Sequence, residues 1–266
     1  MENIHRLLEF ETAGDPMTGL RWTQKTTKKI ADELLLIGIR VCPNTVAKLL
    51  KQLGYSLRTN QKSVSHSSVS KEDRQEQFQY ISQLRECFAA AGHPIISIDT
   101  KKKEMIGNFK NPGKAWTQAP VKVNDHDFRS QSYGMAVPYG IYDTQANHGT
   151  VFVGTSSDTP DFSTDCLSEW YEHVGQHRYP HSNELLILAD SGGSNGSRSR
   201  VWKHRLQEKV ADRFDLTVTV CHYPPGCSKW NPIEHRLFSE ISKNWSGIPL
   251  VSYERVLNYI STTATT

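Results

Sequence analysis

The sequence predicts an α/β fold, in which a mixed sheet is flanked by helices and preceded by a small helical segment. Three short apolar runs, at residues 94–98, 185–189 and 216–221, are rich in aliphatic side chains and indicate buried strands. Between them lie longer segments with apolar residues every three or four positions, a period typical of amphipathic helices. Strands that alternate with helices in this way favour a sheet covered by helices on its faces.

The remaining elements follow from the same patterns. A hairpin is expected from residues 135–142 and 150–154, and its antiparallel strands make the predicted sheet mixed. Two short helices are expected between residues 23 and 55, separated at Gly38 and Pro43 and with Asn44 or Thr45 as cap of the second. Longer helices are predicted over residues 73–91, 161–175, 198–210 and 232–245.

The chain is expected to have three parts. Residues 1–58 form a helical segment that is compatible with a helix-turn-helix, although a small helical layer on the core fits the same pattern. Residues 59–72 are rich in Ser, Asn, Gln and Lys, which indicates a linker. Residues 73–266 then form the α/β domain.

The charge of the chain is distributed unevenly. Residues 20–62 hold nine Lys and Arg against only Asp32 and Glu33, whereas the whole chain of 266 residues has a net charge of only +3. The rest is therefore net negative. A basic block beside a mildly acidic one indicates a nucleic-acid surface attached to a part that handles cations, although a basic run is also compatible with a plain solvated face.

The composition argues against a secreted or membrane protein. No run approaches the roughly 18 consecutive apolar residues of a membrane span. Acidic Glu2, Glu9 and Glu11 stand where a signal peptide is basic and then apolar. The five cysteines are scattered and odd in number, so we expect reduced thiols and a cytoplasmic protein.

Three acidic residues form the most informative pattern in the chain. Asp99 and Asp190 each follow a predicted buried strand, where α/β sheets place ligand sites. Glu234 lies on the last long helix, and at 100° per residue it falls in the middle of the apolar face. A buried carboxylate needs a partner, and a divalent cation shared with the two aspartates would supply one. The alternative is structural, because Glu234 also has the spacing to close a capping box with Asn231.

The chemistry of these side chains favours a hard cation. Three carboxylates with few soft ligands nearby suit Mg²⁺ or Mn²⁺ better than zinc. Two such ions about 4 Å apart activate a water or 3′-hydroxyl and stabilise the leaving oxygen of a phosphodiester. Asp99 is expected to bridge the ions, while Asp190 and Glu234 each hold one.

Three sequence blocks carry a resemblance to a known family. They are DTKKKE at 99–104, ADSGGSNG at 189–196 and PPGCSKWNPIEHR at 224–236. In this order and spacing they resemble the catalytic blocks of bacterial insertion-sequence DDE transposases, with the nearest likeness to the ISAzo group. The third block is also similar to the Pro-Pro…Asn-Pro-x-Glu segment of mariner-like enzymes.

The resemblance implies an RNase H-like catalytic domain at 73–266 and Mg²⁺-dependent cleavage and strand transfer of DNA. It implies catalytic, metal-binding roles for Asp99, Asp190 and Glu234, with two Mg²⁺ or Mn²⁺ ions per site. The implied partners are double-stranded DNA, as element ends and target, and further copies of the chain in a homodimer or larger assembly. A bacterial protein of this kind is nucleoid-associated when it binds DNA.

Two departures from the family stand out. Cys227 occupies the position where the family has Thr, which matters little for metal binding. The family also has a longer N-terminal region and continues further past the segment around Val256, so we expect a truncated reading frame.

Seven further residues are candidate DNA contacts. The lysines after the first predicted strand could contact phosphates, although a solvated turn fits them equally well. The Gly-rich turn after Asp190 precedes two arginines, and its amides could hold a phosphate. The full set is Lys101, Lys102, Lys103, Arg198, Arg200, Lys229 and Asn231. Two other functions remain open, namely an RNase H-like nuclease that cuts without joining and an inactive DNA-binding remnant of a transposable element.

Overall fold

The computed structural model describes residues 25–57, 70–227 and 230–264, together with residue 4 and two short strands, β1 (Ala13–Gly14) and β2 (Arg21–Trp22). The chain divides into two compact units, Met1–Val64 and Ser65–Thr266. Most of the predicted linker lies outside the described residues. Its last residues are not linker, because the Ser70 side chain accepts a hydrogen bond from the N–H of Asp73 and caps a helix.

The first unit is built around two helices, α2 (Thr27–Leu36) and α3 (Pro43–Gln52). Ile30, Leu34 and Val46 are buried in a hydrophobic cluster that the two helices share. The expected cap of α3 at Asn44 or Thr45 is wrong, because Pro43 is already its first residue and Cys42 precedes it as cap. Proline suits this position, since the first helical N–H needs no partner within the helix.

The second unit contains a six-stranded mixed sheet. Its strands are β3 (Ile95–Thr100), β4 (Glu104–Ile106), β5 (Gly134–Asp143), β6 (His148–Gly154), β7 (Glu184–Ala189) and β8 (Thr217–His222). The order is β4-β5-β3-β7-β8, with β6 paired to β5. The strands β3, β7 and β8 are parallel, whereas β5 runs antiparallel to β3, β4 and β6. The predicted mixed sheet, including its hairpin, is confirmed.

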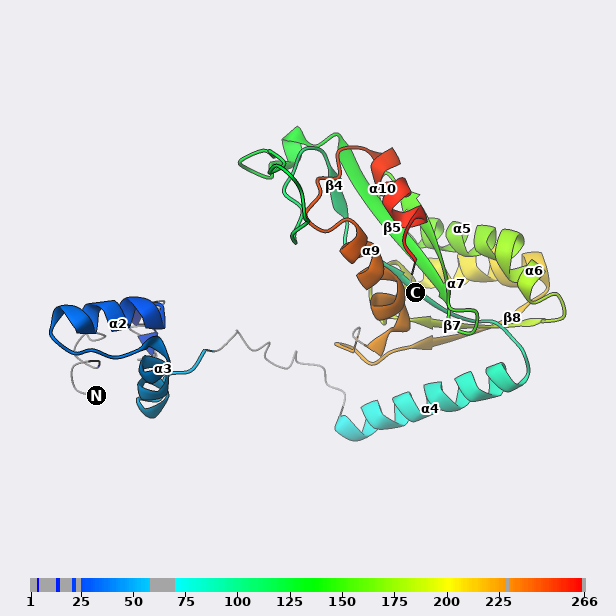
Figure 1. Cartoon of the computed structure of the whole chain (residues 1–266). Coiled ribbons are helices and arrows are strands. Elements are labelled where there is room, and N and C mark those ends of the chain that lie inside the picture. The colour runs from blue at the N-terminus through cyan, green and yellow to red at the C-terminus, as the bar shows by residue number, and fades with distance from the viewer. Residues whose placement is uncertain are drawn as a thin grey trace. The chain divides into compact units, whose positions relative to one another are not determined.

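Helices cover both faces of the sheet (Figure 1). The alternation of side chains along β7 shows how, because Leu185 and Ile187 pack with α5 (Pro160–Trp170) and α7 (Arg200–Leu206), while Leu186 and Leu188 pack beneath α4 (Lys71–Ala90). Strands buried on both faces explain the near-continuous apolar runs in the sequence. Around α5 and α7, helical turns continue through η2 (Tyr171–Gly175), α6 (Gln176–Arg178), η4 (Gln207–Ala211) and α8 (Asp212–Phe214).

A third group of helices packs on the β4, β5 and β6 side of the sheet. It comprises η6 (Glu234–Phe238), α9 (Ser239–Asn244) and α10 (Tyr253–Ser261), with Ile233, Phe238 and Ile241 in its buried cluster. The segment that the sequence predicted as one α-helix therefore contains, after its first two residues, a π-helical turn that starts at Glu234. Such turns are rare and often occur at functional sites.

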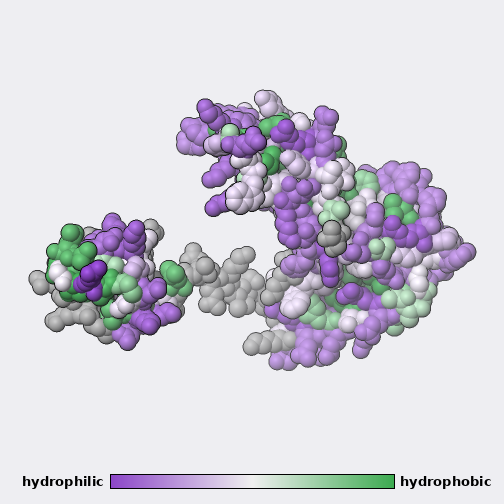
Figure 2. Space-filling view, in the orientation of Figure 1, coloured by the Kyte–Doolittle hydropathy of each residue, from purple (hydrophilic) through white to green (hydrophobic). Residues whose placement is uncertain are grey.

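The surface of the second unit is mostly hydrophilic on the face that Figure 2 shows. This follows from the packing, because most of the large apolar side chains of the unit lie in the buried clusters on the two sides of the sheet. Trp116 and Tyr133 are exceptions, since both are exposed in the long connection between β4 and β5. Within the described ranges, no helix is long and apolar enough to cross a membrane.

Candidate active site

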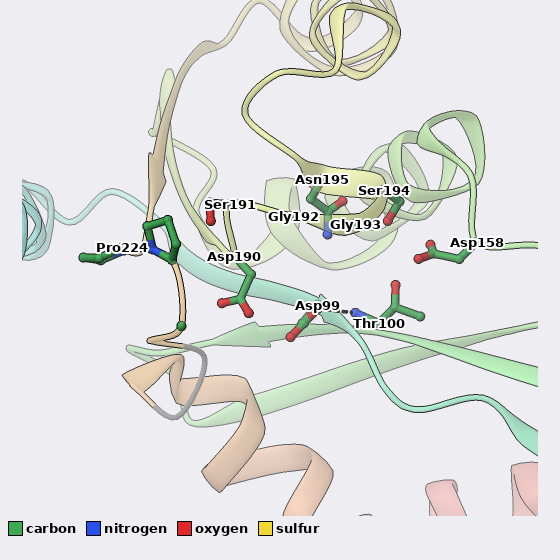
Figure 3. A pocket seen from close by; sticks show the side chains of 12 residues that line it. Asp99, Thr100, Asp158, Asp190, Ser191, Gly192, Gly193, Ser194, Asn195 and Pro224 are labelled. Carbon is green, nitrogen blue, oxygen red and sulfur yellow. Dashed lines mark hydrogen bonds between the residues drawn. The ribbon is translucent and has the colours of Figure 1, made fainter. Parts of the chain in front are cut away.

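Two of the three predicted acids stand side by side at the ends of parallel strands. Ile98 of β3 pairs with Ala189 of β7, so that Asp99 and Asp190 are the next residues on neighbouring strands. Figure 3 shows both carboxylates turned toward the same region. They line one cavity of about 430 Å³, together with the loop that follows β7 and the turn that follows β8.

The third acid reaches the site from a distant part of the chain. Glu234 is the first residue of η6, and its carboxyl lies near enough to that of Asp99 to contribute to the raised pKa of Asp99. In the described part of the chain, no side-chain hydrogen bond caps the start of η6. The capping-box alternative for Glu234 is therefore not what the structure adopts.

The electrostatics of the cluster centre on Asp99. Burial, the charges of Asp190 and Glu234, and the hydrogen bond with Glu234 raise the pKa of Asp99 to about 7, although the N–H of Thr100 bonds its Oδ1 at 2.8 Å and opposes the shift. Burial also raises the pKa of Asp190, against hydrogen bonding from Asn231 and the charge of His222. Both raised pKa values mean that the folded site disfavours the ionised form of these carboxyl groups.

The three carboxylates influence one another, but their oxygens are not close enough together to be the ligands of one small ion. Among the described residues, the only three potential ligands whose donor atoms all lie within 4.8 Å of one another are Glu169, Glu172 and His173, which are largely exposed on α5 and η2. Asp99, Asp190 and Glu234 are therefore spread more widely than the ligands of a single small ion. Asp99 is the member that both of the others influence.

Asn231 and Ser97 fix the position of the third acid relative to the sheet. The Ser97 hydroxyl, on β3, donates to Oδ1 of Asn231, and Asn231 Nδ2 donates to Oδ1 of Asp190 at 3.4 Å. Ser97 Oγ also accepts the N–H of Ile233 at 3.3 Å, and so caps the helix that carries Glu234. Both side chains are 0% exposed.

Gly140 allows that helix to approach the sheet at the level of Asp99. It lies opposite Asp99 in the β3–β5 register. A Cβ atom at Gly140 would be 2.6 Å from Phe238 Cε1 and 2.8 Å from Ile233 Cδ1, both on the segment that flanks Glu234. The absence of a side chain at this position is therefore what lets the Glu234 segment lie against the strand.

Two hydrogen bonds to Asn195 fix the Gly-rich loop that follows Asp190. Tyr139 donates its hydroxyl to Oδ1 of Asn195 at 3.0 Å, and His222 Nε2 bonds the Asn195 carbonyl oxygen at 2.8 Å. Both anchors come from strands of the sheet, β5 and β8. The loop is thereby fixed as one wall of the cavity.

The predicted DNA contacts that the structure describes are either exposed or buried. Lys102, Lys103, Arg198 and Arg200 are exposed, and Lys229 lies outside the described residues. Lys101 requires a correction, because it is 8% exposed, pairs with Glu104 at 2.8 Å and lies 4.5 Å from the ring centroid of Trp245.

Asn231 requires a second correction. Its side chain is buried against Ser97 and Asp190, so it is placed to support the acids rather than to meet DNA. Three residues of the site were not predicted from the sequence, namely Ser97, Gly140 and Asp158, of which the last lines the same cavity. The polar Ser97 within an otherwise apolar strand was the one signal that could have found any of them.

Solved structures share this fold. The chain is similar to a Mos1 transposase paired-end complex with the left transposon end, with 14% identity, a TM-score of 0.52 and coverage of 98% of this chain and 69% of that one. It is similar to the mariner Mos1 paired-end complex with Mg at 15% identity and a TM-score of 0.53, covering 97% and 68%, and to the complex with Mn at 15% and 0.51, covering 98% and 70%. No curated protein sequence matches the chain.

These similarities confirm the RNase H-like fold that the sequence blocks implied. The class of protein is thus one with an RNase H-like fold. The chain belongs to the family described as the Rhodopirellula transposase DDE domain, which matches residues 3–266. It is a DDE transposase, an enzyme that cleaves DNA and transfers strands, as the resemblance predicted.

Proposed function

We propose that Asp99, Asp190 and Glu234 are the catalytic acids of this transposase and that they hold two divalent ions. The observation that carries the proposal is the position of Asp99, whose pKa is raised to about 7 by burial and by the other two acids. A carboxylate placed where ionisation is unfavourable becomes a good ligand when a cation replaces its proton. The donor set consists of oxygens, which suits Mg²⁺ or Mn²⁺.

The spacing of the acids favours two ions over one. Oxygens bound to one Mg²⁺ at about 2.1 Å are separated by at most about 4.2 Å, whereas the three acids do not all lie within 4.8 Å of one another. Two ions roughly 4 Å apart accommodate the wider spread if Asp99 is shared. Asp190 would then be a further ligand of one ion, and Glu234 a further ligand of the other.

The bound ions would supply activation of the attacking water or 3′-hydroxyl and charge stabilisation at the leaving oxygen. The protein's own contribution is positional. Asn231 orients Asp190 through its Nδ2, and Ser97 holds both Asn231 and the first turn of the helix that bears Glu234. Such partners of ligating carboxylates tune metal sites strongly, even though they do not touch the metal.

The first unit is proposed to bind DNA. Lys48 and Lys51 are exposed on α3, and Arg40 is exposed just before it, so this helix presents positive charge beside its buried Val46. The similar Mos1 structures are complexes with transposon end DNA. By analogy, we propose that this chain binds the ends of its own element and target DNA, and that it does so as a dimer or larger assembly.

The experiment that tests the proposed function uses the full chain and labelled DNA that carries the element's ends. With Mg²⁺ we expect both cleaved ends and products joined to a target. Asp99→Asn, Asp190→Asn and Glu234→Gln should each abolish both products while end binding persists. Cleavage without joining would favour a nuclease, and unchanged activity in all three variants would overturn the assignment of the acids.

The role of the first unit is tested separately by DNA binding. Lys48→Gln with Lys51→Gln should weaken binding at low salt and reduce the slope of log K against log salt by about one for each phosphate that the variant no longer neutralises. Lys243→Gln, on α9 and paired with Glu240, is the matched control. Equal salt slopes in all proteins would exclude α3 from the DNA surface.

A further inference from the structure

A second group of polar side chains lines the active-site cavity without taking part in the acidic cluster. The hydroxyls of Thr100 and Ser194 and one carboxylate oxygen, Oδ1 of Asp158, are buried. In the described part of the chain, none of these three atoms has a hydrogen-bond partner. Figure 3 shows the three side chains turned toward one another, beside the pair formed by Asp99 and Asp190.

Buried polar atoms without partners are rare in folded proteins and call for an explanation. Three such side-chain atoms meet in this one cavity, although they come from three separate segments of the chain. Ser194 is only 7% exposed, so its hydroxyl has little access to bulk solvent. A site that leaves three polar atoms facing one space is built to receive a ligand with complementary hydrogen-bonding groups.

The neighbouring groups do not satisfy these atoms. The Tyr139 hydroxyl donates to Asn195 and is therefore not available to Asp158. Asp158 directly precedes Thr159, whose side chain caps α5 by accepting the N–H of Phe162. The carboxylate is thus held at the start of α5, where the helix dipole favours negative charge.

The chemistry of the three atoms selects the ligand. A carboxylate such as that of Asp158 accepts hydrogen bonds and repels phosphate, so within DNA the group that it binds is a neutral donor. The two hydroxyls donate or accept, and can therefore serve acceptor atoms beside that donor. In DNA, an amino group next to ring acceptors occurs on the pairing edges of cytosine and adenine, and carboxylates pair with the cytosine amino group in known interfaces.

We propose that Asp158, Thr100 and Ser194 form a base-recognition subsite, which binds the amino-bearing pairing edge of an unpaired nucleotide beside the scissile phosphate. The inference rests on the proposed function, because the phosphate of the same nucleotide lies at the acids. The cavity of about 430 Å³ falls within the roughly 300 to 1,000 Å³ of small-ligand sites. The pairing edge is accessible only when the base has left the duplex, as in other enzymes that extrude a nucleotide.

The test measures binding of 5′-mononucleotides to the full chain in Mg²⁺ by saturation-transfer NMR. We expect dCMP to bind about tenfold more tightly than dTMP, a pyrimidine of the same size without the amino group. Asp158→Asn should bring the two affinities together, because an amide serves either edge. Asp125→Asn, which removes the same charge from an exposed loop, should leave the ratio unchanged.

The outcomes separate this inference from the proposed function. Dideoxy-CMP should bind like dCMP, and a loss of its binding would assign the subsite to the 3′-hydroxyl and overturn base recognition. Equal affinities for dCMP and dTMP in a metal-dependent complex would also overturn it, while leaving the metal site intact. A cytosine preference that persists without any dependence on Mg²⁺ or Asp99 would support the subsite and contradict the proposed metal site. Thermal melting of Asp158→Asn verifies that the variant is folded.

Discussion

Asn231 and Asp190 are hydrogen-bonded through Nδ2 and Oδ1 at 3.4 Å, and this bond ties the loop before the Glu234 helix to the end of β7. The partner of Asn231 on its other side is the hydroxyl of Ser97, from β3. One side chain thereby links the elements that carry all three acids. A shift of Asn231 would change the distance between acids that lie far apart in the sequence.

Replacement of Asn231 by alanine should therefore lower the rate of DNA cleavage more than it lowers DNA binding. We expect a loss of about 10- to 100-fold in rate, as for other residues that orient metal-binding carboxylates. The free energy of unfolding should fall by about 1 to 3 kcal/mol, since Ser97 loses its buried partner. Single-turnover cleavage and urea denaturation measure the two effects. The control is Asn258→Ala at an exposed position of α10, and full activity in Asn231→Ala would contradict the positioning role.

Gly140→Ala should impair the site through packing alone. The added Cβ would clash with Phe238 and Ile233 and push the Glu234 segment away from Asp99. Overpacking of this kind typically costs about 1 to 3 kcal/mol of stability. We expect weaker Mn²⁺ binding by calorimetry, with partial recovery in the double variant Gly140→Ala with Phe238→Leu. Unchanged Mn²⁺ affinity in Gly140→Ala would show that the close approach is not required.

The stability of the metal-free protein should depend on pH through Asp99. Its folded pKa is about 7 against an ordinary value of 3.8, so between these values the folded chain keeps a proton that the unfolded chain has lost. The free energy of unfolding should accordingly fall as pH rises through this window, by about 1 to 3 kcal/mol between pH 5 and pH 8. Asp190, whose pKa is also raised, acts in the same direction.

The measurement is urea denaturation in the presence of a chelator at several pH values. Asp99→Asn has no proton to lose at this position, so its stability should change less with pH and should exceed that of the parent at pH 8. Parallel pH profiles for the two proteins would contradict the crowding of negative charge around Asp99.

Much of the fold could be predicted because strands buried on both faces leave plain apolar runs in the sequence. The acids at the ends of β3 and β7 could be predicted from the same pattern, since two carboxylates at equivalent strand ends lie where α/β sheets place their ligand sites. The position of Glu234 was harder, because the assumed 100° per residue does not apply to the π-helical turn from Glu234 to Phe238.

Tertiary contacts account for what the sequence did not reveal. The local sequence around Lys101 is typical of a solvent-exposed turn. In the fold, however, Trp245 and Glu104 contact its side chain. The bonds of Asn231 join residues more than 40 positions apart, and no local pattern encodes them. Asp158 lies in a connecting segment without periodicity, so only the folded cavity shows that it faces Thr100 and Ser194.

The most direct test of the proposed metal site is a crystal structure of the full chain grown with Mn²⁺ and measured at the manganese absorption edge. We predict two anomalous peaks about 4 Å apart, one between Asp99 and Asp190 and the other between Asp99 and Glu234. Asp99→Asn should lose both. An absence of manganese at these three acids, or ions bound only at the exposed Glu169, Glu172 and His173, would contradict the assignment of the active site.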